Sequence, residues 1–191
     1  MKSICVYCGS SDLVQAKYLE AARAMGQAIA ERKLQLVFGG GRTGLMGAVA
    51  DAVMQGGGEV IGVIPHHFNR PELAHGGLTR LELVDDMHQR KARMIELSDA
   101  FIALPGGFGT LEEVFEALTW AQIGLHQKPV GFLNVDGYFD DLLSFLRRAN
   151  ADGFTFHEHQ GLYRHAQEPI AMLDALQAYV LPEGLERWLQ R

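Results

Sequence analysis

Short apolar runs alternate with longer helical segments along the whole chain, and this alternation limits the fold more than any other feature. The runs are rich in Val, Ile and Leu, which is typical of strands that are covered on both faces. We predict strands over residues 3–7, 34–38, 60–64, 80–84, 100–104 and 129–134. We predict helices over residues 15–32, 44–55, 87–97, 111–123, 138–150 and 170–179. This order predicts an α/β fold, a Rossmann-like doubly wound parallel sheet of about six or seven strands.

Composition indicates one globular domain over residues 1–191. The chain is 48% hydrophobic and carries a net charge of −6, with its arginines dispersed rather than gathered in a stripe, so we expect no nucleic-acid partner. It shows neither a signal peptide nor an apolar stretch that could span a membrane, so we expect a cytoplasmic protein with no membrane partner. Cys5 and Cys8 lie three residues apart on or just after a predicted strand, where side chains point to opposite faces. We therefore predict reduced core thiols and no metal site.

A glycine loop at residues 104–113 joins the end of a predicted strand to a helix start that carries carboxylates. Glycines let backbone N–H groups approach a ligand closely, and a helix N-terminus attracts anions, so the loop is typical of a phosphate site. Thr110 and Glu113 also have the spacing of a capping box, in which both side chains satisfy backbone donors at the helix start. The sequence leaves open whether Glu113 is a cap or a functional acid.

A second glycine loop, residues 39–47, follows the second predicted strand. Gly39, Gly41 and Gly44 match the G-x-G-x-x-G spacing, which is a weak signal without its context. A dinucleotide site normally follows the first strand and has an acid at the end of the next one, whereas Glu59 stands at the wrong end of that strand. The sequence therefore favours a mononucleotide or sugar phosphate over a nicotinamide cofactor.

Several further polar segments leave predicted strands at the carboxyl edge of the sheet, where ligands bind in such folds. They include the turn at residues 8–11, the irregular segment 66–79 and the basic cluster at 85–94. The cluster is either a solvated helix face or a site where Arg90 holds a phosphate or a carboxylate. His66, His67 and His88 lie near the same edge and are rival general acids.

Together these motifs resemble the Lonely Guy family of cytokinin-activating enzymes. The similarity spans roughly residues 3 to 180 and rests on Cys8-Gly9-Ser10-Ser11, on the 39–47 loop, on Met87-His88-Gln89-Arg90-Lys91 and on Pro105-Gly106-Gly107-Phe108-Gly109-Thr110 with Glu113. Members of this family are often labelled lysine decarboxylases. The chain is short for a pyridoxal phosphate decarboxylase and places no lysine in a recognisable Schiff-base setting, so we expect no cofactor.

The resemblance implies hydrolysis of the N-glycosidic bond in nucleoside 5′-monophosphates, which releases the free base and ribose 5-phosphate. Substrates would be N6-modified adenosine monophosphates such as the isopentenyl form, and plain AMP is included for bacterial members. It further implies a homodimer, to whose interface the helix at 111–123 could contribute. The implied catalytic pair is Arg90 and Glu113. The implied substrate-binding residues are Glu72, Lys91, Gly107, Phe108, Gly109, Thr110, Leu111, Glu112 and Thr119, with Gly9, Ser10, Gly40 and Gly41 as weaker candidates.

The chemistry of this reaction suits the residues. Breaking the bond builds positive charge on the ribose, so Glu113 could stabilise that state or orient the attacking water. Arg90 would either keep Glu113 ionised or contact the substrate, and Glu72 would hold ribose hydroxyls or the base. Met94, Phe115, Leu118 and Trp120 could line an apolar pocket for a prenyl group, or they belong to the core. The alternatives to hydrolysis are a nucleotide carrier or sensor without chemistry and an NAD-dependent oxidoreductase.

Overall fold

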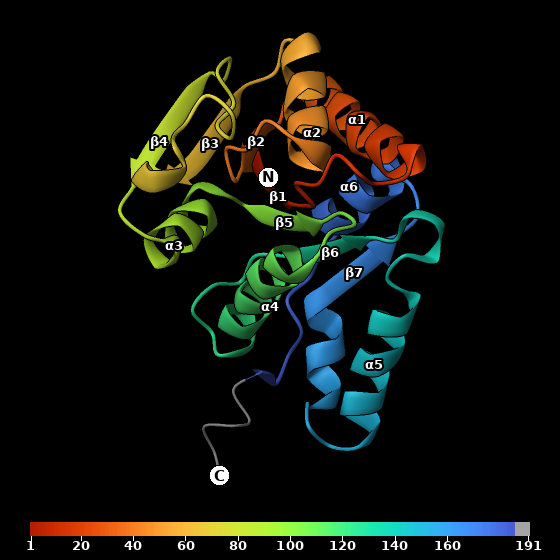
Figure 1. The fold of residues 1–191 in the computed structure, drawn as a ribbon. Helices are drawn as coiled ribbons and strands as arrows, with labels where there is room; N and C mark the ends of the chain where they lie inside the picture. The colour runs from red at the N-terminus through yellow and green to blue at the C-terminus, as the bar shows by residue number, and fades with distance from the viewer. Residues whose placement is uncertain (186–191) are drawn as a thin grey trace.

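The computed structural model describes residues 1–185 as one seven-stranded parallel sheet in the order β4-β3-β2-β1-β5-β6-β7, which confirms the predicted fold (Figure 1). The strands are β1 Ser3–Tyr7, β2 Gln35–Phe38, β3 Val60–Pro65, β4 Arg80–Val84, β5 Ala100–Ala103, β6 Val130–Leu133 and β7 Tyr163–Ala166. Sequence patterns located the first six of these and missed β7. This edge strand has the sequence YRHA and no fully buried residue, so it carries no apolar run.

Helices connect the strands and agree with the predicted segments to within a few residues. They are α1 Ala16–Glu31, α2 Gly44–Gln55, α3 Met87–Leu97, α4 Phe108–Gln122, α5 Asp140–Ala151 and α6 Pro169–Gln177, with short 3₁₀ turns η1 His66–Phe68, η2 Val135–Gly137 and η3 His157–Leu162. One shifted boundary matters for function. Helix α4 begins at Phe108, three residues before the predicted start at Leu111. None of the helices among residues 1–185 is both long and apolar enough to cross a membrane.

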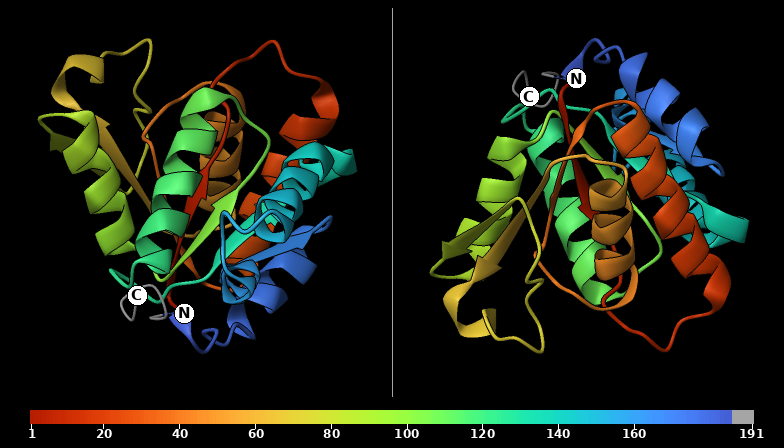
Figure 2. Two further views of the ribbon diagram at one scale, coloured as in Figure 1. Left: turned by 90° about the horizontal axis from the view of Figure 1, so that it is seen from below. Right: turned by 90° about the horizontal axis from the view of Figure 1, so that it is seen from above.

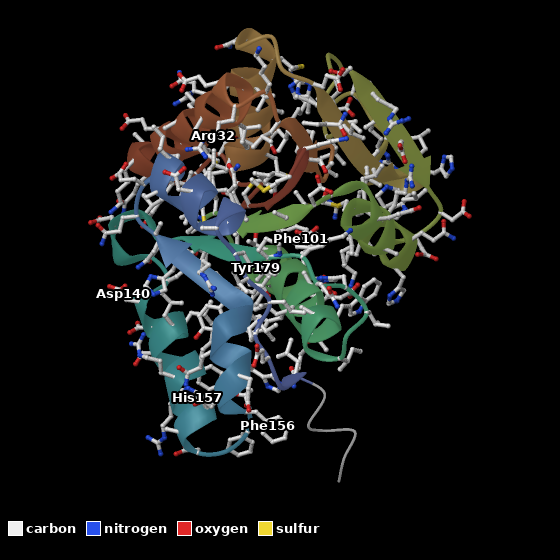
Figure 3. All side chains as sticks on the ribbon, turned by 180° about the vertical axis from the view of Figure 1, so that it is seen from behind. Arg32, Phe101, Asp140, Phe156, His157 and Tyr179 are labelled. Carbon is white, nitrogen blue, oxygen red and sulfur yellow. The ribbon has the colours of Figure 1, made fainter. Side chains whose placement is uncertain are left out.

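The helices cover both faces of the sheet and give three layers. Helices α1, α2 and α6 pack on one face, and α3, α4 and α5 pack on the other (Figure 2). Because neighbouring strand residues point to opposite faces, Cys5 joins the core with α3 and α4 while Cys8 joins the core with α1 and α2. Both thiols are buried and unpaired, as predicted. Phe101, labelled on β5 in Figure 3, is fully buried in the core with α3 and α4. Its ring stacks parallel to that of Tyr7.

The strand order reverses at β1, which lies between β2 and β5. At such a switch point the loops that follow the two adjacent strands separate and leave a crevice at the carboxyl edge. Here the loop after β1 is tied to the loop after β5, because the backbone N–H of Gly9 donates to the carbonyl of Pro105 at 3.1 Å. The same edge receives the loop after β2 and the start of α3, which carries the chain onward from β4. The fold therefore brings the predicted motifs to one place.

Candidate active site

A cavity of about 580 Å³ opens at this switch point. Its walls come from the loop after β1, the start of α1, the glycine loop after β5 and single side chains of α2 and α3. The lining residues are Cys8, Gly9, Ser10, Ser11, Val14, Tyr18, Met46, Arg90, Gly106, Gly107, Phe108, Gly109, Thr110, Glu113 and Tyr138. Eight of the predicted site residues are among them, including both members of the predicted catalytic pair.

Glu113 and Arg90 form an ion pair inside this cavity. Glu113 lies on the inward face of α4 and Arg90 on α3, and the distance from Arg90 Nη1 to Glu113 Oε1 is 3.1 Å. Their side chains are only 10% and 13% exposed. Burial raises the pKa of Glu113 to about 7, because desolvation of the carboxylate outweighs the opposing attraction of Arg90. The carboxyl group is therefore poised to change its charge near neutral pH.

The position of Arg90 is set by the start of α3, which fixes its backbone, and by hydrogen bonds to its guanidinium. Asp86 caps the start of α3 by accepting a hydrogen bond from the backbone N–H of Gln89 at 2.8 Å, which places Arg90 in the first turns of the helix. The guanidinium then donates from Nε to the Val63 carbonyl at 3.0 Å and from Nη2 to the Gly39 carbonyl at 3.1 Å. Arg90 thus touches backbone of β3 and of the 39–47 loop as well as Glu113.

The N-terminus of α4 faces the cavity without a side-chain cap. Gly107 is the N-cap residue and Thr110 lies within the first helical turn, so the predicted capping box is wrong. The helix starts before Thr110 because Phe108 and Gly109 already belong to its first turn. Thr110 is 3% exposed, and its hydroxyl has no hydrogen-bond partner among residues 1–185. The first backbone N–H groups of a helix have no partner within the helix, so this end offers donors to an anion.

The other glycine loop presents a helix start that is already satisfied. The backbone N–H of Gly44 donates to Asp12 Oδ1 at 2.7 Å, and that of Leu45 donates to the Gly9 carbonyl at 2.9 Å. The Thr43 hydroxyl is also used within the protein, because it donates to the Ser10 carbonyl at 2.8 Å. The N-terminus of α2 is therefore used to hold the loop after β1.

A second cavity, of about 260 Å³, adjoins the first and shares Ser10, Met46 and Arg90 with it. It is lined by Ser10, Gly39, Gly41, Thr43, Met46, Ile64, Pro65, Phe68, Leu73 and Arg90. Phe68 and Leu73 come from the irregular segment 66–79, which is fastened to the 39–47 loop through hydrogen bonds from Arg42 N to the Leu73 carbonyl and from His75 N to the Gly40 carbonyl, each 2.9 Å long. Sequence reasoning missed these two side chains, although large apolar residues in an irregular loop were a usable signal.

Some predicted site residues lie elsewhere. Glu72 is exposed in the turn just before Leu73 and lines neither cavity. Lys91 is buried, and its amino group binds Glu112 and Glu116 of α4. Burial lowers the pKa of Lys91, but these hydrogen bonds outweigh it, so the net shift is upward. The remaining candidates outside the cavities are Leu111, which packs on the core, Gly40 in the turn after β2, and Thr119, which is exposed on α4.

The predicted prenyl-pocket residues do not line the Arg90 cavities. Met94 and Leu118 belong to the core between the sheet and α3 and α4, and Phe115 and Trp120 pack against that core. The helical spacing of these four residues therefore indicated packing on the core and not a binding role. His66, His67 and His88 are exposed and line neither of the two cavities, so the structure gives none of these histidines a place beside Glu113.

Tyr138 is a cavity residue that the sequence did not reveal. It follows η2, packs edge-on against Tyr18 with ring centroids 5.4 Å apart, and donates its hydroxyl proton to the Gly106 carbonyl at 2.8 Å. Its ring therefore forms one wall of the cavity while its hydroxyl supports the glycine loop after β5. The only available signal was its position shortly after the carboxyl end of a predicted strand.

Comparisons with known proteins agree with this geometry. Residues 46–176 match a family described as "Possible lysine decarboxylase". The chain is 55% identical over 154 residues to a cytokinin riboside 5′-monophosphate phosphoribohydrolase of Rhodococcoides fascians, covering 80% of this chain and 78% of that protein. It is 49% identical over 179 residues to a probable enzyme of the same name from Oryza sativa subsp. japonica, covering 94% of this chain and 79% of that protein.

Solved structures share the fold at lower identity. A molybdenum cofactor binding protein from Rippkaea orientalis aligns with a TM-score of 0.71 at 25% identity, over 93% of this chain and 97% of that one. A molybdenum cofactor carrier protein from Chlamydomonas reinhardtii aligns with the same TM-score at 23% identity, over 93% of this chain and 98% of that one. The structural likeness therefore spans nearly the whole length of each protein.

Proposed function

This chain belongs to the Lonely Guy family of cytokinin riboside 5′-monophosphate phosphoribohydrolases, and we propose that it hydrolyses the N-glycosidic bond of N6-modified adenosine 5′-monophosphates. Water adds to C1′ of the ribose, the bond to the base nitrogen breaks, and the products are the free base and ribose 5-phosphate. The observation that carries this proposal is the buried Arg90–Glu113 pair, which shares one cavity with the uncapped N-terminus of α4.

The 5′-phosphate binds at the start of α4 in this proposal. The backbone N–H groups there lack partners within the helix, the helix dipole favours an anion, and the Thr110 hydroxyl is unpartnered in the described part of the chain. A Cβ added at Gly107 or Gly109 would meet no other part of the described chain within 4 Å, which leaves room for a bulky anion. Glu113 lies one turn further along the same helix, so a ribose attached to the phosphate reaches its carboxylate.

Glu113 acts in its ionised form. A carboxylate beside C1′ stabilises the positive charge that develops on the ribose, and it can also take a proton from the attacking water. Arg90 helps to keep that carboxylate charged against the effect of burial. Lys91 is not suited to Schiff-base chemistry, because two carboxylates hold its amino group in the protonated state, so the decarboxylase description has no support at this residue.

The base extends toward the adjoining 260 Å³ cavity. That cavity meets the larger one at Arg90 and Met46, and Phe68, Leu73, Ile64 and Pro65 make its far side apolar. An apolar substituent on N6 would bury surface there, at about 25 cal/mol per Å². We expect Leu73→Asn to lower kcat/KM for isopentenyl-AMP several-fold more than for AMP. An equal loss for both substrates would place the substituent elsewhere.

The decisive experiment is incubation of the protein with AMP and with isopentenyl-AMP, followed by chromatography for free base and for ribose 5-phosphate. Release of both products in equal amounts supports the proposal. Binding of either nucleotide without release of base would instead support a carrier or sensor. Absorbance changes with a nicotinamide cofactor would support the oxidoreductase alternative.

The proposal includes a homodimer in the cytoplasm. The turn after α4 presents apolar side chains to solvent, with Ile123 44% and Leu125 64% exposed. A groove lined in part by Phe115, Leu118 and Thr119 runs along the same helix. Light scattering after size exclusion tests the dimer, and a monomer of unchanged activity would refute it. The two buried, unpaired thiols suit a reducing compartment.

A further inference from the structure

We propose that Gly39 is a positioning residue for Arg90, and through Arg90 sets the charge state of Glu113. In this inference Gly39, in addition to lining the cavity proposed for the base, forms part of a socket for the Arg90 side chain. The socket is built from the carbonyls of Gly39 and Val63, which accept hydrogen bonds from two nitrogens of the Arg90 guanidinium at 3.1 and 3.0 Å. This inference rests on the proposed function only for those tests that measure activity.

Position 39 needs a glycine because the Arg90 guanidinium lies where a side chain would start. The backbone conformation at this position does not require one. Its φ lies outside the left-handed region, in contrast to Gly40 and Gly44, whose φ values are 74° and 59°. A Cβ at position 39 would lie 1.8 Å from Arg90 Nη2 and 3.0 Å from its Cζ. The next nearest atom is the Met46 sulfur, at 3.3 Å. Any side chain at this position must therefore displace the guanidinium.

Displacement of the guanidinium would act on Glu113 because the socket leaves Nη1 of Arg90 to the carboxylate. With Nε and Nη2 bound to backbone carbonyls, Nη1 lies 3.1 Å from Glu113 Oε1. The three nitrogens of a planar guanidinium move as one rigid group. A side chain at position 39 that displaces Nη2 therefore also displaces Nη1 and changes the ion pair with Glu113. The carbonyl contacts also compensate the cost of burying the charge of Arg90.

Other charged groups around Glu113 do not replace Arg90. Lys91 of α3 also lowers the pKa of Glu113, but its amino group is bound to Glu112 and Glu116, which raise that pKa. On the β1 side, Cys5, Tyr7 and Cys8 remain neutral, because burial raises the pKa of each well above its usual range. Arg90 is therefore the cation that directly opposes the effect of burial on this carboxyl group.

The test is Gly39→Ala, with the titration of Glu113 as its readout. We expect the pKa of Glu113 to rise by about one unit, since an opposite charge at this distance typically moves a carboxyl pKa by one to three units. The titration is followed by carbon-13 NMR of protein labelled at the glutamate carboxyl carbon, with Glu113→Gln assigning the signal. The rising limb of kcat/KM against pH should move by the same amount. The NMR measurement needs no substrate, so it still tests the socket if the proposed reaction is wrong.

Two further variants separate a positioning role from a merely structural one. In an Arg90→Ala background the space beside Gly39 is empty, so adding Gly39→Ala should change neither the titration of Glu113 nor the melting temperature. Gly41→Ala is the matched change in the same loop, because its Cβ would lie 2.7 Å from the terminal methyl of Met46. It should leave the pKa of Glu113 in place, whatever its effect on KM.

Three results would overturn the socket. They are an unshifted Glu113 titration in Gly39→Ala, an equal effect of Gly39→Ala with and without Arg90, or an equal pKa shift in Gly41→Ala. If Gly39→Ala alone does not fold, the double variant with Arg90→Ala decides the question. A soluble double variant supports displacement of Arg90, and an insoluble one shows that Gly39 is needed by the loop itself.

Discussion

The chain contains two strand–glycine–helix units, one after β2 and one after β5, and they use the same sequence pattern for different purposes. In the first unit, the protein itself occupies the space beside the glycines. A Cβ at Gly44 would lie 2.6 Å from the Ser10 backbone, and one at Gly47 would lie 2.1 Å from the Arg42 carbonyl oxygen. In the second unit, a Cβ at Gly107 or Gly109 would meet no other part of the described chain within 4 Å.

The helix starts differ in the same way. The N-terminus of α2 is filled by Asp12 and by the Gly9 carbonyl, whereas that of α4 has no side-chain cap and lies beside the unpartnered Thr110 hydroxyl. A glycine loop is therefore a candidate ligand site when its donors and its space are left unused by the protein. Substitutions in the two units and at the groups that fill or leave open their helix starts test this contrast.

Glu113→Gln should remove most of the turnover that we assign to the second unit. We expect kcat for base release to fall by about 10³-fold, within the range typical of lost acid–base and electrostatic catalysis. Because wild-type Glu113 has a pKa of about 7 and acts as the carboxylate, wild-type kcat/KM should rise as the pH increases through about 7. Turnover of the variant near the wild-type level would exclude Glu113 as the catalytic group.

The same variant should be more stable than the wild type at alkaline pH. The pKa of Glu113 is raised in the folded protein from an ordinary 4.5 to about 7, so folding favours the protonated form. Its contribution to stability is complete below about pH 4 and is lost as the pH rises through 7. Urea unfolding should find Glu113→Gln more stable by about 3 kcal/mol at pH 8 and no different at pH 4. An equal difference at both pH values would mean that the carboxyl group is not buried in its charged form.

A matched pair of glycine substitutions tests the contrast directly. Gly47→Ala places a Cβ against the Arg42 backbone and should cost about 3 kcal/mol of stability, as overpacking does. Gly109→Ala meets open space and should stabilise α4 by up to about 1 kcal/mol, while raising KM about tenfold by crowding the phosphate. Chemical denaturation and steady-state kinetics measure both. A stability loss in Gly109→Ala with unchanged KM would remove the distinction between the loops.

Thr110→Val should weaken substrate binding without weakening the fold. The hydroxyl has no partner within the described residues, so the protein loses no hydrogen bond, and the free energy of unfolding should stay level or rise. A hydrogen bond to a charged phosphate is worth about 1.5 kcal/mol or more, which corresponds to at least a tenfold increase in KM. Thr110→Ser keeps the hydroxyl and is the control. If both variants bind substrate like the wild type, the phosphate lies elsewhere.

Most of the fold could be predicted from the sequence because buried parallel strands and their helices have strong apolar periods. The exception is β7, a polar edge strand. It is held in the sheet by backbone pairing with β6, and its own residues form no apolar run. Within the site, motif positions predicted that Arg90 and Glu113 would meet, because both follow strands at one edge of the sheet. They could not predict that Lys91, the next residue after Arg90, points to Glu112 and Glu116, since neighbouring helix residues face different directions.

The Thr110–Glu113 spacing was consistent with a cap and with a functional acid, and the start of α4 at Phe108 excludes the cap. The difference between the two glycine loops was also hidden from the sequence. It depends on Asp12 and Gly9, which lie more than 30 residues before the helix that they cap, and on Arg90, which reaches back from α3. Contacts between residues so distant along the chain leave no local pattern.

Asp12→Ala should have the smallest effect and is the sharpest test of the contrast. It removes the side chain that accepts from Gly44 N and should cost about 1 kcal/mol of stability, similar to the loss of a capping side chain from a helix N-terminus. Base release should stay within about twofold of the wild type, because Asp12 lines neither cavity beside Arg90. If unused donors are what make a glycine loop an anion site, the uncapped α2 should also gain weak affinity for inorganic phosphate, measurable as NMR shifts at Gly44 and Leu45. Unchanged spectra with added phosphate would mean that an open helix start is insufficient, and that the free space beside Gly107 and Gly109 is the decisive difference.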